Sequence, residues 1–236
     1  VSPVVAVGVV QATLAQLKNT FGMDIERPKE ALGGKGGIRV AFKPSLSANT
    51  SGIVDYMNHY SYTCMEQKIS KAVALQDINM WKKVMSELPA YLDHDGLVKY
   101  FPVMSDGSDI LTSYILSISN EAGMEVPEKI RQHMEGGLKA FVEGKIRRYG
   151  SVQKPDFNLR RIAAIEALSR YGHADISYFD SIKIEPDLLP TSAVLDWIGI
   201  IQRLKDLPER QQRLSAAEKV IRTRLNFQGT RMGFST

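Results

Sequence analysis

The chain of 236 residues contains a single cysteine, Cys64, and only four histidines. One cysteine cannot form an internal disulfide, and it cannot build a cluster of thiolate ligands for a metal. The histidines lack the spacing of metal ligands, so the sequence predicts no metal site and no cofactor. They are His59, His94, His133 and His173. The sequence also lacks a His-Glu-x-x-His motif and a Gly-x-Ser-x-Gly turn, so it gives no support to zinc proteases or serine hydrolases.

Long apolar runs and basic clusters are missing too. No apolar run reaches the roughly 20 residues that cross a bilayer, and residues 1–10 lack the basic flank and cleavage site of a signal peptide. The net charge is +4, but Lys and Arg occur in small separated pairs without interleaved aromatic residues, so we expect no nucleic-acid binding. Because the chain has no initiator methionine, we expect it to be part of a longer protein.

Residues 1–44 differ in pattern from the rest. Apolar residues alternate at Ile38, Val40 and Phe42, which predicts a half-buried strand. The glycine-rich stretch before it, residues 33–37, predicts a turn and not a phosphate loop, because no Ser or Thr follows its lysine. We therefore interpret residues 1–44 as a partial β segment and linker that leads into a second region, residues 45–236.

The second region has helical periodicity. Residues 162–168 and 194–201 are apolar on nearly all sides, as in helices that are buried all round. Residues 127–148 and 206–227 carry one apolar stripe and many charges, as in helices of an outer layer. Inner and outer helices in alternation predict a mainly α fold, an α/α toroid of helical hairpins with a short β segment at the N-terminus.

The only cysteine lies in residues 60–67, Tyr-Ser-Tyr-Thr-Cys-Met-Glu-Gln. The periodic residues behind it predict a helix that opens at Cys64, which places Gln67 on the same face with Cβ atoms about 5–6 Å apart. Attack of the sulfur on the side-chain carbonyl of Gln67, with loss of ammonia, would close a ring that holds a thioester. Met65 and Glu66 would complete that ring. The alternative is a buried free thiol that packs as a small hydrophobic residue.

This stretch resembles the thioester motif of the α2-macroglobulin and complement family, where Cys-x-Glu-Gln follows Tyr-x-Tyr-x. Residues 95–102 and 108–114 are similar to two further segments of that family, Asp-Gly-Gly-aromatic and Ser-Asp-x-x-Thr-x-Tyr. Ser61 and Thr63 replace the proline and glycine that bacterial members usually carry, which touches neither reacting residue. The resemblance implies the same α/α toroid, and the smaller number of helices predicted here leads us to expect a truncated C-terminus or a shortened member.

The resemblance also implies a function. It implies the thioester domain of a bacterial α2-macroglobulin-like protease inhibitor, not an enzyme, which traps a target protease by acylating its lysine amines through Cys64 and Gln67. Tyr60, Tyr62 and Met65 are candidates for an apolar screen over the bond, and ordinary core packing is the alternative for them. Family members bury the bond against aromatic residues at a domain interface, so other domains of the same longer chain are implied to cover it as well. Complement-type members use a distant histidine to reach hydroxyls, and no histidine here has that context, so amines are the expected acceptors.

The location and companions follow from the resemblance as well. It implies the periplasm, with a lipid anchor in the inner membrane attached upstream of this chain, and a penicillin-binding protein as functional companion.

Two alternatives remain. The first is a helical toroid that binds a protein partner without covalent chemistry, against which the intact Cys64 and Gln67 argue. The second is a glycosidase, because α/α toroids also host glycosidases that use paired acids. The candidate pairs are predicted to lie in polar loops and are Asp93 with Asp95 and Asp106 with Asp109.

Overall fold

The computed structural model describes residues 51–61, 63–146, 154–228 and 231–234, together with residues 20, 22 and 24. The chain divides into two compact units, and one of them, residues 51–224, is here called the helical unit. The other includes two antiparallel strands, β1 (Leu225–Gln228) and β2 (Arg231–Phe234), paired from Leu225 with Phe234 to Gln228 with Arg231. The strand predicted around residues 38–42 lies outside the described residues.

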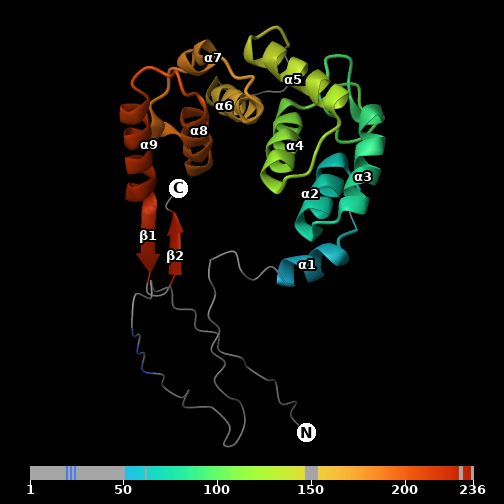
Figure 1. The fold of residues 1–236 in the computed structure, drawn as a ribbon, viewed down its shortest axis with the longest axis horizontal. Coiled ribbons are helices and arrows are strands. Elements are labelled where there is room, and N and C mark those ends of the chain that lie inside the picture. The colour runs from blue at the N-terminus through green and yellow to red at the C-terminus, as the bar shows by residue number, and fades with distance from the viewer. Residues whose placement is uncertain are drawn as a thin grey trace, which may run out of the picture. The chain divides into compact units, whose positions relative to one another are not determined.

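The helical unit consists of α-helices and short 3-10 turns (Figure 1). They are α1 (Ser51–Asn58), α2 (Met65–Leu75), α3 (Ile78–Glu87), η1 (Leu88–Tyr91), α4 (Asp109–Ala122), α5 (Glu128–Val142), α6 (Lys154–Arg170), α7 (Ile176–Asp180), η2 (Pro186–Leu188), α8 (Thr191–Arg203) and α9 (Arg210–Arg224). Among the helices that the structure describes, none is both long enough and apolar enough to cross a membrane. The prediction of a mainly α fold is confirmed.

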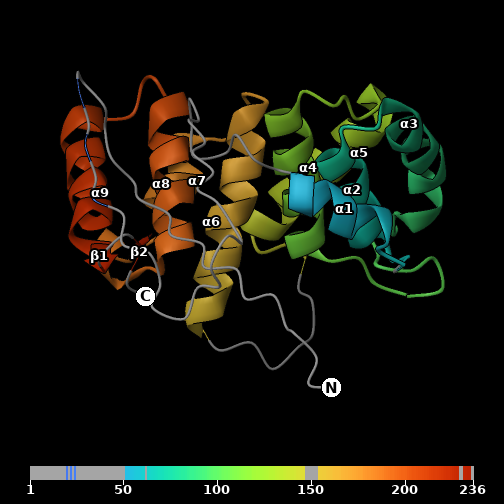
Figure 2. The same ribbon diagram turned by 90° about the horizontal axis from the view of Figure 1, so that it is seen from below.

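Alternate helices form two layers. In the first, α2 contacts α4, α4 contacts α6 and α6 contacts α8. In the second layer, α3 packs against α2, α5 against α6 and α9 against α8. Figure 2 shows α6, α8 and α9 side by side. The layers agree with the two kinds of helix predicted from the sequence, whereas closure of the ring into a toroid stays a prediction.

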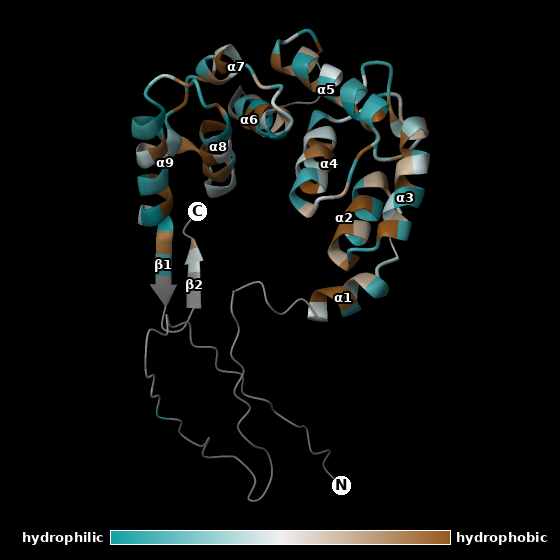
Figure 3. Ribbon diagram, in the orientation of Figure 1, coloured by the Kyte–Doolittle hydropathy of each residue, from teal (hydrophilic) through white to brown (hydrophobic). Residues whose placement is uncertain are grey.

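Burial follows the predicted polarity. Ile165 of α6 and Ile200 of α8 are fully buried, whereas Ala217 is the one buried residue of α9 in its described part. Figure 3 shows the contrast between a largely hydrophobic α8 and a largely hydrophilic α9. Because α8 also turns Leu195 outward, with 51% of that residue exposed, this helix is less completely enclosed than its composition indicates.

Two helices end earlier than predicted. The apolar stripe of residues 127–148 indicated a longer helix than α5, which stops at Val142, two residues before Gly144 takes a left-handed conformation (φ +74°). The stripe of residues 206–227 indicated a helix up to residue 227, but α9 ends at Arg224 and the strand β1 follows. Leu225 and Phe227 belong to β1, where they alternate with polar neighbours. A stripe alone therefore did not show where the helical backbone stops.

A buried ion pair joins the first layer at the start of α4. The Asp109 carboxylate is 1% exposed and accepts two hydrogen bonds from the Arg160 guanidinium on α6, one of them from Nε at 2.8 Å. The same guanidinium lies 5.4 Å from the centre of the Phe141 ring of α5. This bidentate pair fixes the first turn of α4, which carries one of the motifs noted above, against α6.

We expect Asp109→Ala to lower the free energy of unfolding by about 3 kcal/mol, because it removes a buried carboxylate that accepts two hydrogen bonds from the Arg160 guanidinium. Urea unfolding followed by circular dichroism measures this loss. Glu121→Ala is the matched control, since Glu121 pairs with Arg170 at 2.6 Å but its side chain is largely exposed, so it should cost less than about 1 kcal/mol. Equal losses in both variants would show that the Asp109 pair does not hold the layer together.

Candidate thioester site

Cys64 is the N-cap of α2, as the periodicity predicted. Its backbone is extended (φ −68°, ψ 163°), and the residue is 7% exposed. The helix that follows is anchored by Met65, Ile69 and Ala72, which are all fully buried in the core. The sulfur is therefore fixed at the start of a well-packed helix.

Cys64 and Gln67 form a capping box. The backbone N–H of Cys64 donates to Oε1 of Gln67 at 3.2 Å, and the Cys64 side chain in turn faces the backbone N–H of Gln67. In most capping boxes a hydroxyl occupies the first position, and here a thiol takes its place. The structure thus brings together the two side chains that the spacing paired.

The capping box also places a donor where a reaction at Gln67 needs one. If the sulfur of Cys64 attacks the side-chain carbonyl of Gln67, negative charge develops on Oε1. That oxygen already accepts the N–H of Cys64, which would stabilise the charge. The geometry suits acyl transfer between these two side chains.

Met65 and Glu66, the residues between them, have structural partners. The backbone N–H of Met65 donates to the carbonyl of Tyr100 at 3.0 Å. The carboxylate of Glu66 accepts from the Ser70 hydroxyl at 2.6 Å, and that hydroxyl lies 2.7 Å from the Tyr114 hydroxyl of α4. These contacts hold the first turn of α2 against α4 and the loop before it.

The segment at residues 108–114 supports that loop. Ser108 caps α4 by accepting the N–H of Leu111 with its side chain. The Thr112 hydroxyl accepts the N–H of Val98 at 2.8 Å and donates to the carbonyl of Ser108 at 2.7 Å. Because Val98 lies two residues before Tyr100, the start of α4 positions the carbonyl that receives Met65.

The acids of the glycosidase alternative serve the same loop and the core. The carboxylate of Asp93 accepts the N–H groups of Leu97 (2.9 Å) and Gly107 (2.7 Å), which closes the loop between η1 and α4. Gly96 lies inside this loop with φ +87°, and a Cβ there would come within 2.3 Å of the carbonyl oxygen of His133. Asp109 lies in the first turn of α4 and is engaged with Arg160, so one member of each candidate pair, Asp93 and Asp109, holds the fold, and the geometry does not favour the glycosidase alternative.

The histidines have their own neighbours. Nδ1 of His59 lies 2.9 Å from the carbonyl oxygen of Asp55, and Nδ1 of His173 lies 2.6 Å from Oε2 of Glu135. Within the described ranges, no group of three or more His, Cys, Asp or Glu side chains could hold a metal ion.

Of the two tyrosines proposed as a shield, Tyr62 lies outside the described residues. Tyr60 is half-buried, with its ring centre 5.5 Å from that of Tyr56, and its backbone carbonyl accepts from Nζ of Lys71 at 3.0 Å. A shielding role for both stays a prediction.

Two features near Cys64 were not predicted. The first is an anchored lysine: Nζ of Lys68 donates to Oε2 of Glu87 at 2.6 Å and to the Tyr91 hydroxyl at 3.2 Å. The hydrogen bond to Glu87 is the main cause that raises the pKa of Lys68 above its usual range, and the bond to Tyr91 adds to it. In the sequence, the i, i+4 spacing of Cys64 and Lys68 places this lysine on the same helix face as the sulfur. The local pattern does not indicate its contacts with Glu87 and Tyr91.

The second feature is an exposed apolar loop. It directly follows Tyr100, whose carbonyl receives Met65, and it includes Phe101, Val103 and Met104. Val103 is 94% exposed, so this loop presents an apolar surface next to the start of α2. The sequence predicted for residues 95–102 only a similarity to a family segment, because the burial of a loop cannot be read from its composition.

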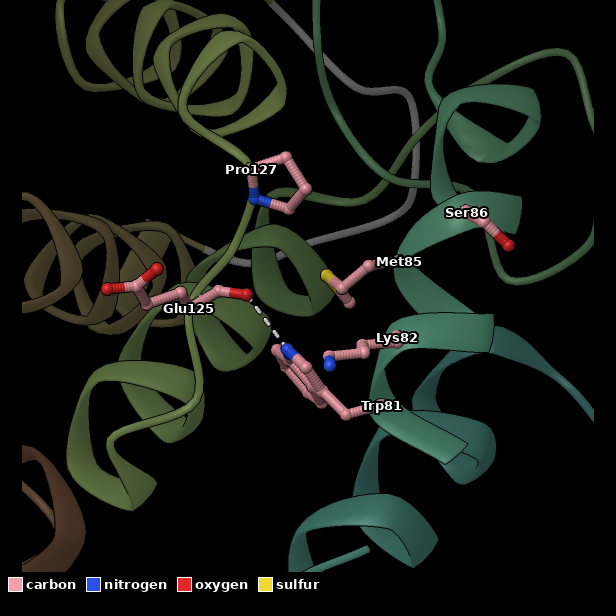
Figure 4. A pocket seen from close by; sticks show the side chains of 6 residues that line it. All are labelled: Trp81, Lys82, Met85, Ser86, Glu125 and Pro127. Carbon is pink, nitrogen blue, oxygen red and sulfur yellow. Dashed lines mark hydrogen bonds between the residues drawn. The ribbon is translucent and has the colours of Figure 1, made fainter. Parts of the chain in front are cut away.

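A shallow open pocket lies elsewhere, between α3 and the segment that enters α5 (Figure 4). Trp81 forms one wall and donates from Nε1 to the carbonyl of Glu125 at 2.8 Å. The other lining residues are Lys82, Met85, Ser86 and Pro127. None of the lining residues belongs to the stretch of residues 60–67, so this pocket is separate from the candidate thioester site.

We expect Cys64→Ser to fold as stably as the parent, because serine is a better N-cap than cysteine and keeps the capping box. Cys64→Ala removes the cap and a small buried volume, so it should lower the free energy of unfolding by about 1 kcal/mol. Thermal melts of the three proteins measure this order. A loss of several kcal/mol in Cys64→Ser would show that Cys64 serves mainly as a core residue.

Comparisons with known proteins agree with this geometry at the level of the fold. No protein-family model matches the chain, and no curated protein matches its sequence. Among solved structures, a crystal structure of native α2-macroglobulin from Escherichia coli, from domain MG7 to the C-terminus, matches with a TM-score of 0.56 and 18% identity over 72% of this chain and 31% of that one. A cryo-EM reconstruction of the native E. coli protein matches with a TM-score of 0.59 and 17% identity, over 73% of this chain and 12% of that one.

A crystal structure of Salmonella α2-macroglobulin reacted with methylamine gives a TM-score of 0.54 and 14% identity, over 77% of this chain and 13% of that one. The chain thus spans less than a third of the length of each structure that it matches. The described region has the fold of a bacterial α2-macroglobulin-like domain.

Proposed function

We propose that the helical unit is the thioester domain of a bacterial α2-macroglobulin-like protease inhibitor. The observation that carries the proposal is the capping box of Cys64 and Gln67, a thiol and a carboxamide held together at the start of α2. The fold likeness to bacterial α2-macroglobulins supports it independently, because it rests on the arrangement of the helices and not on the motif.

Thioester formation would proceed by attack of the Cys64 sulfur on Cδ of Gln67. The carbon–sulfur bond forms, the carbon–nitrogen bond of the carboxamide breaks, and ammonia leaves with the thiol proton. The N–H of Cys64 stabilises the charge on Oε1 during this step. The buried anchors of α2 keep the two groups in place, which lowers the entropic cost of closing the ring.

Capture of a protease would follow by aminolysis. A neutral lysine amine attacks the acyl carbon, a carbon–nitrogen bond forms, the carbon–sulfur bond breaks, and the Cys64 thiolate is released while the amine proton passes to water. The product is a stable amide between the side chain of residue 67 and the protease, so each molecule acts once and is not an enzyme. The Salmonella α2-macroglobulin described as reacted with methylamine supports an amine as acceptor.

The exposed loop at Phe101, Val103 and Met104 suits contact with another domain of a longer chain, since an apolar surface beside a thioester benefits from a cover. Such a cover, with Tyr60 and Tyr62, would keep water from the bond until the whole molecule rearranges. A periplasmic location, a lipid anchor in the inner membrane and a penicillin-binding protein as companion belong to this same proposal.

The test is covalent labelling by methylamine. We expect freshly prepared protein to lack the mass of one ammonia and to carry no thiol that iodoacetamide can alkylate, and methylamine should add to residue 67 and free the thiol. Gln67→Glu is the matched control, because glutamate keeps the capping box but has no ammonia to lose. Cys64→Ser should also stay unlabelled.

The competing function, a helical module that binds proteins without covalent chemistry, predicts a different outcome. In that case the parent protein has its full mass, Cys64 is alkylated at once, and methylamine leaves all three proteins unchanged. Equal labelling of the parent and Cys64→Ser would contradict both proposals for Cys64.

A further inference from the structure

Lys68 is next in the sequence to Gln67, which carries the acyl group of the proposed thioester. It is four residues from Cys64, so it shares a helix face with the sulfur. Side chains on a helix lean toward its N-terminus, so an unrestrained Lys68 side chain could reach the turn that holds Cys64 and Gln67. A free amine on this side chain would compete with external amines for the bond.

A free Lys68 amine would consume the thioester by intramolecular acylation. Groups held in one molecule can react as if present at effective concentrations of up to roughly 10⁵ M or more, so a neutral Lys68 amine would outcompete any external lysine. The thioester would then be lost before a protease arrived. A thioester next to Lys68 therefore requires hydrogen-bond partners that keep this amine protonated and hold it away from the acyl group of residue 67.

The structure contains such a restraint. Nζ of Lys68 donates to Oε2 of Glu87 at the end of α3 and to the Tyr91 hydroxyl of η1, and it lies 5.4 Å from the centre of the Tyr91 ring. The side chains of Lys68 and Glu87 are only 27% and 35% exposed, so this ion pair is partly shielded from water. Its hydrogen bonds favour the ammonium form, which has no lone pair for attack.

We propose that Glu87 and Tyr91 are positioning residues that hold the ammonium of Lys68 away from the Gln67 acyl group, so that the thioester is kept for an external amine. This inference rests on the proposed function. It assigns α3 and η1 a role in the chemistry of α2 that the motif itself does not reveal.

Without the restraint, the thioester would acylate its own helix. The neutral amine of Lys68 attacks the acyl carbon, the carbon–nitrogen bond forms, the carbon–sulfur bond breaks, and the Cys64 thiolate leaves while the amine proton passes to water. The product lacks one ammonia, like the thioester, but it carries a free thiol. Mass together with alkylation therefore separates this amide from the thioester and from hydrolysed or unprocessed protein.

The second lysine of α2, Lys71, provides a comparison. It lies four residues after Gln67, and its Nζ donates to the backbone carbonyl of Tyr60 at 3.0 Å. Substitutions of Glu87 and Tyr91 leave that acceptor unchanged. A cross-link that involves Lys68 and not Lys71 would therefore point to the loss of the Glu87 and Tyr91 contacts.

The experiment uses Glu87→Ala/Tyr91→Phe in the full chain, with and without Lys68→Arg. We expect the double variant to lose at least about tenfold in methylamine incorporation, to carry an alkylatable Cys64, and to yield a tryptic peptide in which residue 67 is joined to Lys68. Adding Lys68→Arg should restore incorporation to the parent level, because the guanidinium is not nucleophilic at neutral pH. Glu121→Ala, which removes a salt bridge away from α2, should label like the parent.

Melting curves establish that each variant is folded, and the milder Glu87→Gln replaces the double variant if the latter melts below the assay temperature. Parent-level incorporation in the double variant, or a loss that Lys68→Arg does not restore, would overturn the positioning role while leaving the thioester in place. An unprocessed parent protein that takes up no methylamine would instead overturn the proposed function, and this inference with it.

Discussion

The structure of the candidate site depends on how the first turn of α2 satisfies its backbone N–H groups. A helix start leaves several donors without partners inside the helix, and here the side chains of Cys64 and Gln67 supply the missing acceptors to each other's backbone. The same exchange sets the sulfur beside the carboxamide carbonyl. One local constraint thus stabilises the helix start and holds a thiol and a carboxamide on the same turn.

The surroundings keep that turn in place. Tyr100 receives the N–H of Met65, Tyr114 binds Ser70, and the buried pair of Asp109 and Arg160 fixes α4 against α6. These residues come from segments more than 30 positions from Cys64, yet they act on one helix turn. The resemblance to the family at residues 95–102 and 108–114 therefore has a physical reason, since these segments carry the contacts that orient the motif.

The sequence predicted what local rules decide. The opening of α2 at Cys64 follows from the spacing of residues within a few positions. The cap of α4 at Ser108 and the change from α3 to η1 before Pro89 depend on equally local rules. The two layers could be predicted because α8 and α9 differ so strongly in polarity.

Long-range features were not predictable in the same way. The pairing of Lys68 with Glu87 joins residues 19 apart and depends on how α2 and α3 cross. The exposure of Val103 depends on the packing of the loop. The apolar residues Leu225 and Phe227 were predicted to continue the stripe of a helix, but they alternate along the strand β1. In each case, tertiary contacts or backbone conformation decided an outcome that the residue pattern left open.

The most direct test of the central claim is the chemical state of residue 67 in freshly prepared protein, read by peptide mass spectrometry across residues 65–68. The account predicts a side chain that has lost its ammonia and is joined to Cys64, with both the glutamate formed by hydrolysis and the parent carboxamide in the minority. An intact carboxamide at Gln67 in all molecules, next to a freely alkylated Cys64, would show that the bond never forms and would contradict the account.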